Sequence, residues 1–332
     1  MLNLHTNKLI KNAGRVALAV YLAAGIVCMS GCSQAVKEAS GALEEYENTQ
    51  EQTDSVGYVY GIPMDENAAI VTDTAVDIYE SSNVKSNRIT QALYNQPVSI
   101  LELESGWARV KTVDGSTGWI KSKYIDKDVS GIFGRSYTHR IIVTSKEKSI
   151  TSRISEGTTM AIVPMGSEFY AFNSSGDAYE VYLSGNRTGW IKSSGIIHVD
   201  LNKKIPVTNP EDFAATALRL KGTRYMLNGL SFMGIDAPGL VYVCARINGI
   251  DLPRTIEGQM NSGVEIDPNE AKAGDIVFMS FDIEHSEISC VGICTGNGEY
   301  IYSGRKAGYV TIGKVSERNN DGIVTAARRV FN

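Results

Sequence analysis

Thiols and imidazoles, which pair in cysteine-dependent acyl transfer, are few in the C-terminal part of the chain. The thiols are Cys244, Cys290 and Cys294, and the one histidine is His285. Covalent acyl transfer pairs a thiol with an imidazole. Helical spacing places Cys244 two turns inside a predicted helix that begins at Ala237, so we expect it in the core. We expect His285, in an acidic loop, to be exposed to solvent. The alternative is a rewired pair of Cys290 with His285, which would move the nucleophile from the helix to a strand and give up the helix dipole.

Cys290 lies on one arm of a predicted hairpin. The turn is Gly296-Asn297-Gly298, a strong hairpin sequence between two apolar runs. Cys290 and Tyr302 are equally far from Gly296, so a symmetric hairpin sets them opposite each other with both side chains on one face. The pair contains no imidazole.

Two helices precede this hairpin. The first begins at Asn209, whose amide is a capping group, and is followed by a proline, two acidic residues and an apolar stripe that ends at Gly222. The second runs from Ala237 to Ile247 and is closed by Asn248-Gly249. With the strands that follow, they predict an α+β domain of about 130 residues.

Two strings in this domain carry a family resemblance: "GIDAPGLVYVCARINGIDLPR" and "ISCVGICTGNGEYIYSG". Across nearly all of residues 209–330 the chain resembles the NlpC/P60 family of papain-like cell-wall peptidases. The resemblance implies a catalytic cysteine at the helix start, a histidine on the following hairpin and a third polar residue on the returning strand. These positions are Ala237, Cys290 and Tyr302. All three catalytic roles are therefore predicted to be vacant, because a nucleophile, a proton acceptor and an orienting group are all missing.

The resemblance also implies a substrate pocket. Tyr225 and Asp236 match the pocket tyrosine and the aspartate that receives the free amine of the substrate, and Gly239 allows close approach at the helix start. Asp236 is equally well placed to cap the helix whatever binds. The tryptophan and the two serines of the family pocket fall at Leu227, Pro238 and Ile256.

A repeat precedes this domain. "TGWIKS" occurs at residues 117–122 and again at 188–193, an offset of 71. Short alternating runs between Gly, Asn, Asp and Ser clusters predict a small all-β barrel for each copy. "ESGWARVKTVDGSTGWIKSKYI" resembles bacterial SH3 domains, which implies binding of cell-wall material or packing against a neighbouring domain.

The tryptophans of the repeat are predicted to differ in role. Trp119 and Trp190 occupy equivalent positions, and we expect both to fill the barrel cores. Trp107 has no aromatic counterpart, because Ala178 stands at the equivalent position. Trp107 is therefore the candidate for a ligand groove.

The N-terminus predicts export. Three basic residues precede an apolar run from Val16 to Met29 that is too short for a membrane span. The run ends in Ser30-Gly31-Cys32, which resembles the lipobox of bacterial lipoproteins and implies cleavage before Cys32 and lipidation of its thiol. An ordinary cleaved signal peptide is the alternative. Residues 33–57 are polar and acidic, so we expect a disordered tether.

Composition limits the function further. The chain has 332 residues, 43% of them hydrophobic, and a formal net charge of -5, which gives no basic footprint for nucleic acid. There is no phosphate loop and no metal-ligand cluster, so no cofactor is expected. Three cysteines in the folded part argue against a disulfide framework, although one pairing through Cys290 or Cys294 stays open.

Together these features predict a multidomain chain with two small all-β SH3-like barrels followed by an α+β papain-like domain. The expected bounds are 1–31 for a signal peptide, 32–57 for the tether, 58–128 and 129–202 for the barrels, and 203–332 for a degenerate NlpC/P60-like domain.

The predicted function is that of a non-catalytic lipoprotein, anchored in the membrane at the outer side of the bacterial cell envelope. Its expected partner is a peptidoglycan stem peptide or an envelope protein. The alternative is an active cysteine endopeptidase that cleaves the γ-D-glutamyl to diamino acid bond of stem peptides. A third hypothesis is that the cleft is filled and the outer surface binds another protein.

Overall fold

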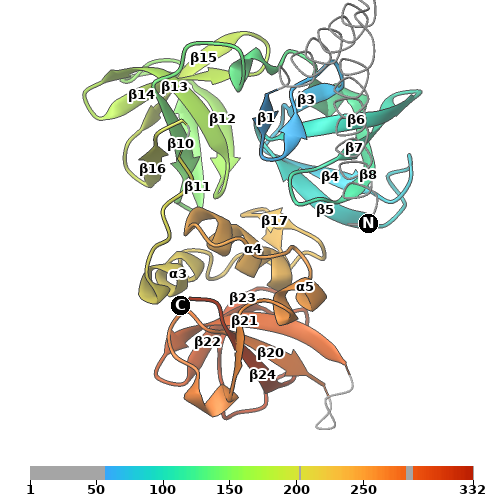
Figure 1. Ribbon diagram of the computed structural model, residues 1–332, viewed down its shortest axis with the longest axis vertical. Coiled ribbons are helices and arrows are strands. Elements are labelled where there is room, and N and C mark those ends of the chain that lie inside the picture. Colours follow the sequence, from blue (N-terminus) through green and yellow to red (C-terminus); the bar gives the residue numbers. More distant parts are fainter. Residues whose placement is uncertain (1–56, 202, 282–286, 332) are drawn as a thin grey trace, which may run out of the picture. The chain divides into compact units, whose positions relative to one another are not determined.

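The computed structural model describes residues 57–201, 203–281 and 287–331 (Figure 1). The predicted signal peptide, Cys32, most of the tether and His285 lie outside the described residues. Among the residues that are described, no helix is long and apolar enough to cross a membrane.

The first barrel is a seven-stranded sheet with the order β5-β4-β8-β7-β6-β3-β9. A short hairpin, β1 (Tyr58–Val59) and β2 (Ile62–Pro63), precedes it. The barrel strands are β3 (Ala68–Val71), β4 (Ala75–Tyr79), β5 (Arg88–Leu93), β6 (Pro97–Glu104), β7 (Trp107–Lys111), β8 (Thr117–Lys121) and β9 (Ile125–Asp126).

The second barrel repeats this topology, with the order β12-β11-β15-β14-β13-β10-β16. Its strands are β10 (His139–Val143), β11 (Glu147–Thr151), β12 (Thr159–Pro164), β13 (Glu168–Ser175), β14 (Ala178–Leu183), β15 (Arg187–Lys192) and β16 (Ile196–Val199). Each strand occupies the place of the strand about 71 positions earlier in the chain, so the sequence repeat is a structural repeat.

The alternation of each strand decides where the tryptophans lie. On β8, Gly118 and Ile120 face the core while Trp119 is only half-buried on the opposite face, and Trp190 of β15 is placed in the same way. The prediction that both tryptophans fill the cores is therefore wrong. A side chain at Gly118 would come within 2.6 Å of the Tyr79 carbonyl oxygen, so the inner face there accepts only glycine.

The described residues of the C-terminal domain form three helices and a six-stranded sheet with the order β19-β24-β20-β21-β22-β23. The helices are α3 (Pro210–Leu218), α4 (Ala237–Ile247) and α5 (Ile256–Met260). The strands are β17 (Leu230–Ser231), β18 (Gly234–Ile235), β19 (Val264–Ile266), β20 (Ile276–Ser280), β21 (Ile288–Gly296), β22 (Glu299–Ser303), β23 (Val310–Lys314) and β24 (Ile323–Arg329). Three 3-10 turns complete the described elements: Ser122–Tyr124, Val129–Gly131 and Pro268–Glu270.

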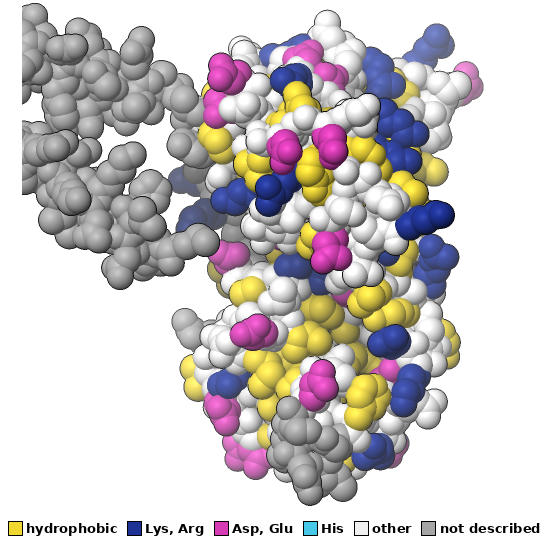
Figure 2. All heavy atoms as spheres, turned by 90° about the vertical axis from the view of Figure 1, so that its right-hand side faces the viewer, with side chains coloured by type: hydrophobic (Ala, Val, Ile, Leu, Met, Phe, Trp, Pro, Cys, Tyr) yellow, Lys and Arg dark blue, Asp and Glu magenta, His cyan; other side chains and the backbone are white. Residues whose placement is uncertain are grey.

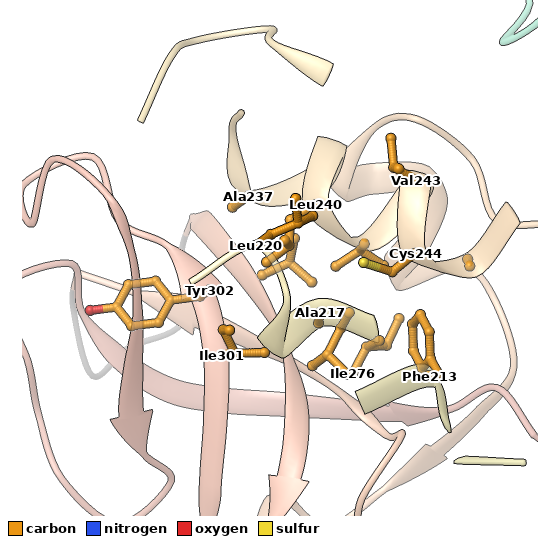
Figure 3. Close-up of a cluster of buried hydrophobic side chains, with 14 of the residues drawn as sticks. Phe213, Ala217, Leu220, Ala237, Leu240, Val243, Cys244, Ile276, Ile301 and Tyr302 are labelled. Carbon is orange, nitrogen blue, oxygen red and sulfur yellow. The ribbon is translucent and has the colours of Figure 1, made fainter. Parts of the chain in front are cut away.

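Both predicted helix starts are confirmed. The Asn209 side chain accepts a hydrogen bond from the Asp212 amide at 2.7 Å, and Pro210 occupies the first turn of α3. Helices α3 and α4 pack against β21 and β22 and bury their apolar faces there. Figure 3 shows Cys244 among these core side chains. It is fully buried, as predicted, and so its role is packing.

Candidate functional site

A cleft of about 430 Å³ lies in front of the N-terminus of α4. Ile89 and Ser116 of the first barrel form one wall. The start of α4, the start of α5 and the β21–β22 strands form the others, so the cleft contains Ala237, the position that the family resemblance assigns to the nucleophile.

Ala237 is the first residue of α4 and lines this cleft. Asp236 caps the helix and Pro238 follows in its first turn, so the local sequence fixes where the helix begins. The helix dipole would favour a negative charge at this point. The Ala237 side chain is a methyl group, which supplies no electron pair for attack and no proton.

The hairpin register differs from the prediction for Cys290 and Tyr302. The turn is centred on Asn297-Gly298, and an irregularity between Cys294 and Gly296 moves the pairing back by one residue. Tyr302 therefore lies opposite Gly292, two residues from Cys290. The two residues share a face of the sheet as diagonal neighbours, so the predicted direct opposition is wrong and the predicted common face holds.

Cys290 lines the cleft but is 5% exposed. Its sulfur lies 3.8 Å from the Val291 carbonyl oxygen and 3.9 Å from that of Ser303. Burial raises the pKa of the Cys290 thiol well above its ordinary value, and the Asp321 carboxylate raises it further. The thiol is therefore held in its protonated form, which is the opposite of an activated nucleophile.

Tyr302 is 3% exposed and is not among the residues that line the cleft. In Figure 3 its ring points away from the labelled core cluster. Burial, the Asp321 charge and a hydrogen bond to Asp321 raise the pKa of its hydroxyl. Tyr302 thus keeps its proton and is engaged with Asp321, a carboxylate on the cleft lining.

Asp236 is buried, and both of its carboxylate oxygens interact with other groups of the protein. Its Oδ1 accepts a hydrogen bond from the Gly239 amide at 2.8 Å and lies 2.9 Å from Arg254 Nη2. Its Oδ2 accepts one from the Asn228 amide at 2.9 Å. A side chain at Gly239 would come within 2.5 Å of the Gly229 carbonyl oxygen, so this glycine admits the neighbouring loop. The capping role predicted for Asp236 is confirmed.

The mouth of the cleft is apolar where the family pocket is polar. Tyr225 lines it and is half-buried. Leu227 is 58% exposed, and Pro238 and Ile256 lie beside it on the lining. Figure 2 shows hydrophobic side chains gathered in the middle of the visible face, with charged side chains scattered around them. The arrangement suits apolar contact more than polar recognition.

Trp107 lies on the first barrel and does not line this cleft. Its ring packs edge-on against Tyr79 at 5.8 Å, and the Lys121 ammonium lies 5.8 Å from its centre. Tyr79 and Lys121 line a separate pocket of about 310 Å³, to which Arg224, Met226 and Met233 of the C-terminal domain also contribute. Trp107 thus packs against Tyr79, a residue that lines this pocket. That the Trp107 ring binds a ligand in a groove remains a prediction.

Sequence reasoning missed three charged residues at the cleft. Arg254 pairs with Asp236, Asp321 accepts hydrogen bonds from the amides of Lys306 and Ala307, and Arg305 is exposed on the lining. Arg254 was detectable only as a charged residue in the segment between α4 and α5. Asp321 carries no local signal, because only the return of the chain to β24 brings it to the site.

No cluster of metal-ligating side chains occurs within the described part of the chain. Cys244, Cys290 and Cys294 are free and buried, so the open question of a disulfide through Cys290 or Cys294 is answered. Among the described residues, the cleft presents an apolar mouth and charged side chains to a ligand.

Comparison with known proteins agrees with this geometry. Residues 222–329 match the model of the NlpC/P60 family, and residues 74–126 match that of the bacterial SH3 domain. The C-terminal domain is an NlpC/P60 domain.

Similar proteins match different lengths of this chain. The gamma-D-glutamyl-L-lysine dipeptidyl-peptidase of Bacillus subtilis (strain 168) is 22% identical over 262 residues, which cover 73% of this chain and 81% of that protein. A probable endopeptidase NlpC homolog of Haemophilus influenzae is 29% identical over 140 residues, covering 42% of this chain and 73% of that protein. A crystal structure of an NlpC/P60 family protein from Bacillus cereus ATCC 10987 has a TM-score of 0.72 at 19% identity, covering 79% of this chain and 99% of that chain. This last likeness concerns the fold.

The NlpC/P60 domain therefore keeps the scaffold of a peptidoglycan hydrolase family. Its α4 start and its β21–β22 hairpin both reach the cleft, but they bring Ala237 and a protonated Cys290 there.

Proposed function

We propose that this chain is a non-catalytic receptor for cell-wall peptide at the bacterial cell envelope, with the NlpC/P60 cleft as its binding site. The observation that carries the proposal is Ala237 at the N-terminus of α4, inside a cleft that is otherwise open. Covalent catalysis has no nucleophile at this position. The neighbouring thiol of Cys290 is buried, which supports the same conclusion.

Its ligand would be a peptidoglycan stem peptide, the material on which the family acts. Arg305 is exposed on the lining, and no ion pair is found for it among the described residues, so it is free to meet a carboxylate of such a peptide. Leu227 and Ile256 offer apolar surface to its side chains. The second proposed partner is an envelope protein, which would insert an apolar segment into the mouth of the cleft.

The proposed location follows from the N-terminal sequence. A lipid on Cys32 would hold the mature chain at the membrane, and the polar stretch of residues 33–57 would give the folded part reach into the wall. The proposed domain bounds are 58–128 and 129–202 for the SH3 domains and 203–332 for the NlpC/P60 domain. Trp107 would add wall contact outside the cleft.

The competing function is that of an active endopeptidase, cutting the γ-D-glutamyl to diamino acid bond. The mature full-length protein should be titrated calorimetrically with the tripeptide L-Ala-γ-D-Glu-diamino acid, and the same mixtures followed by mass spectrometry. We expect binding without cleavage. Arg305→Gln should weaken binding by about tenfold, since a hydrogen bond between charged groups contributes about 1.5–3 kcal/mol.

The matched control is Arg153→Gln, which removes an exposed arginine of the second barrel outside the cleft. Cleavage that is lost in Cys290→Ser would establish the endopeptidase instead. If the tripeptide is neither bound nor cleaved, the remaining hypothesis is that the cleft binds an envelope protein. Crosslinking through a reactive group introduced at Leu227 would then identify that protein.

A further inference from the structure

A second cavity, of about 590 Å³, lies where the two barrels and the NlpC/P60 domain meet. It shares no lining residue with the cleft at α4. The β1–β2 hairpin contributes Tyr60 and the second barrel contributes Arg140 and Tyr170. Helix α4 contributes Tyr242 from its middle and Arg246 from its last turn. Its volume is within the range of small-molecule sites, which occur preferentially at domain interfaces.

The cavity carries an excess of positive charge. Arg140, Arg246, Lys203 and Lys204 all line it, whereas Asp251 is the one acidic residue on its wall. Both lysines are exposed, and neither has an ion pair among the described residues. An anion entering this cavity would therefore meet unpaired cations.

The two arginines share a single carboxylate. Arg246 Nη2 lies 3.0 Å from Glu168 Oε1, and Arg140 Nε lies 3.4 Å from Glu168 Oε2. The Glu168 side chain is 4% exposed, and its Oε2 and Arg140 Nε both lack a hydrogen-bond partner among the described residues. Burial lowers the pKa of Arg140, and the charge of Arg246 lowers it further. The single negative charge of Glu168 thus balances only part of the positive charge of the two guanidinium groups.

An aromatic side chain holds these guanidinium groups in place. The ring of Tyr60 lies 4.6 Å from the Arg246 guanidinium carbon and 5.6 Å from that of Arg140. Tyr60 has a φ of 54°, in the left-handed region that a tyrosine rarely adopts. Strained residues of this kind persist where the surroundings fix them, often at binding sites.

We propose that this junction cavity is a second ligand site, separate from the cleft, which binds a small molecule through a phosphate or carboxylate group. Lys203 and Lys204 contact the anionic group from the open side, and the arginines supply the positive field behind it. The apolar part of the ligand lies against Tyr170 and Tyr242. The site does not depend on the function proposed for the cleft.

Calorimetric titration of the mature full-length protein with inorganic phosphate, and separately with glutarate, tests the site. We expect at least one probe to bind at millimolar concentration. Lys203→Gln combined with Lys204→Gln should weaken that binding about tenfold. Binding of phosphate alone would identify a phosphoryl ligand, and binding of glutarate alone a carboxylate ligand.

The matched control is Lys85→Gln with Lys127→Gln, which removes the same charge from exposed positions outside the cavity. An equal loss in this control would show that only the overall charge matters and would overturn the proposal, as would a failure of both probes to bind. Stem-peptide binding at the cleft should be the same in both double variants, so the two proposals fail independently.

Discussion

Arg254 and Asp236 form a buried ion pair at the first turn of α4, with Arg254 Nη2 2.9 Å from Asp236 Oδ1. The same carboxylate caps the helix through the Gly239 amide and holds the loop before the helix through the Asn228 amide. Its charge is therefore already balanced within the protein. The family resemblance assigns Asp236 to a substrate amine. In this structure Asp236 instead stabilises the wall of the cleft.

The first prediction concerns this pair. Asp236→Asn keeps a capping side chain but leaves Arg254 buried without its counter-charge, which should cost about 3–5 kcal/mol of the free energy of unfolding. Urea denaturation measures the loss. Asp267→Asn is the control, because Asp267 is an exposed cap without an ion pair and should cost about 1 kcal/mol or less. Equal costs for the two variants would argue against the buried pair.

The second prediction concerns thiol reactivity. Burial raises the pKa of Cys290 above that of an unfolded thiol, about 8.5. The folded protein should therefore resist iodoacetamide at Cys290 up to about pH 9, while the unfolded chain reacts readily. Since the folded state holds the proton more tightly, this thiol should stabilise the fold below about pH 8.5 and lose that contribution as the pH rises further.

Mass spectrometry of the peptide that contains Cys290 gives the labelling rate in the folded and unfolded protein. Faster labelling of the folded protein at neutral pH would reveal an activated thiol, which would favour the endopeptidase over the receptor.

The third prediction concerns anchoring. Cys32→Ala removes the thiol that the lipobox would lipidate, so the mature protein should leave the membrane fraction or remain unprocessed. Cell fractionation followed by immunoblotting measures its distribution. Cys28→Ala, within the apolar run, is the matched control and should leave the distribution unchanged. Membrane association of Cys32→Ala equal to that of the natural protein would exclude the lipid anchor.

The local sequence was sufficient to predict elements whose ends are marked by capping residues or by a repeat. Helix α4 begins and ends where its capping residues and Asn248 predict, and the repeat of 71 residues gives two barrels of one topology. The predicted core positions of the two tryptophans were wrong because the residues on either side of each tryptophan face the core, which turns the tryptophan to the opposite face of the strand. A glycine and an isoleucine fill the inner face in each repeat, which leaves Trp119 and Trp190 on the outer one.

Long-range contacts were not predictable in this way. The pairing of Cys290 and Tyr302 depends on where the turn is centred and on one irregularity in the strand, neither of which the spacing from Gly296 contains. The Arg254–Asp236 pair needs two segments that only the folded domain brings together. The cavity at Tyr60 depends on the packing of the β1–β2 hairpin, the second barrel and α4, which are far apart in the sequence.

The last prediction restores the missing groups. Ala237→Cys places a thiol at the start of α4, where the helix dipole favours the thiolate. Cys290→His supplies an imidazole from the neighbouring strand, and Tyr302→His supplies the third polar group on the same face. We expect the triple variant to show alkylation of the introduced thiol well below the ordinary thiol pKa of about 8.5.

The double variant Ala237→Cys with Cys290→Ala is the control, since it carries the thiol at the helix start without an imidazole. Its thiol should titrate at higher pH than that of the triple variant, because only the dipole stabilises its thiolate. Hydrolysis of wall peptides need not return, since Pro238 and Ile256 alter the pocket that would hold the substrate within reach. Identical alkylation profiles in the two folded variants would mean that positions 237 and 290 do not converge on one site.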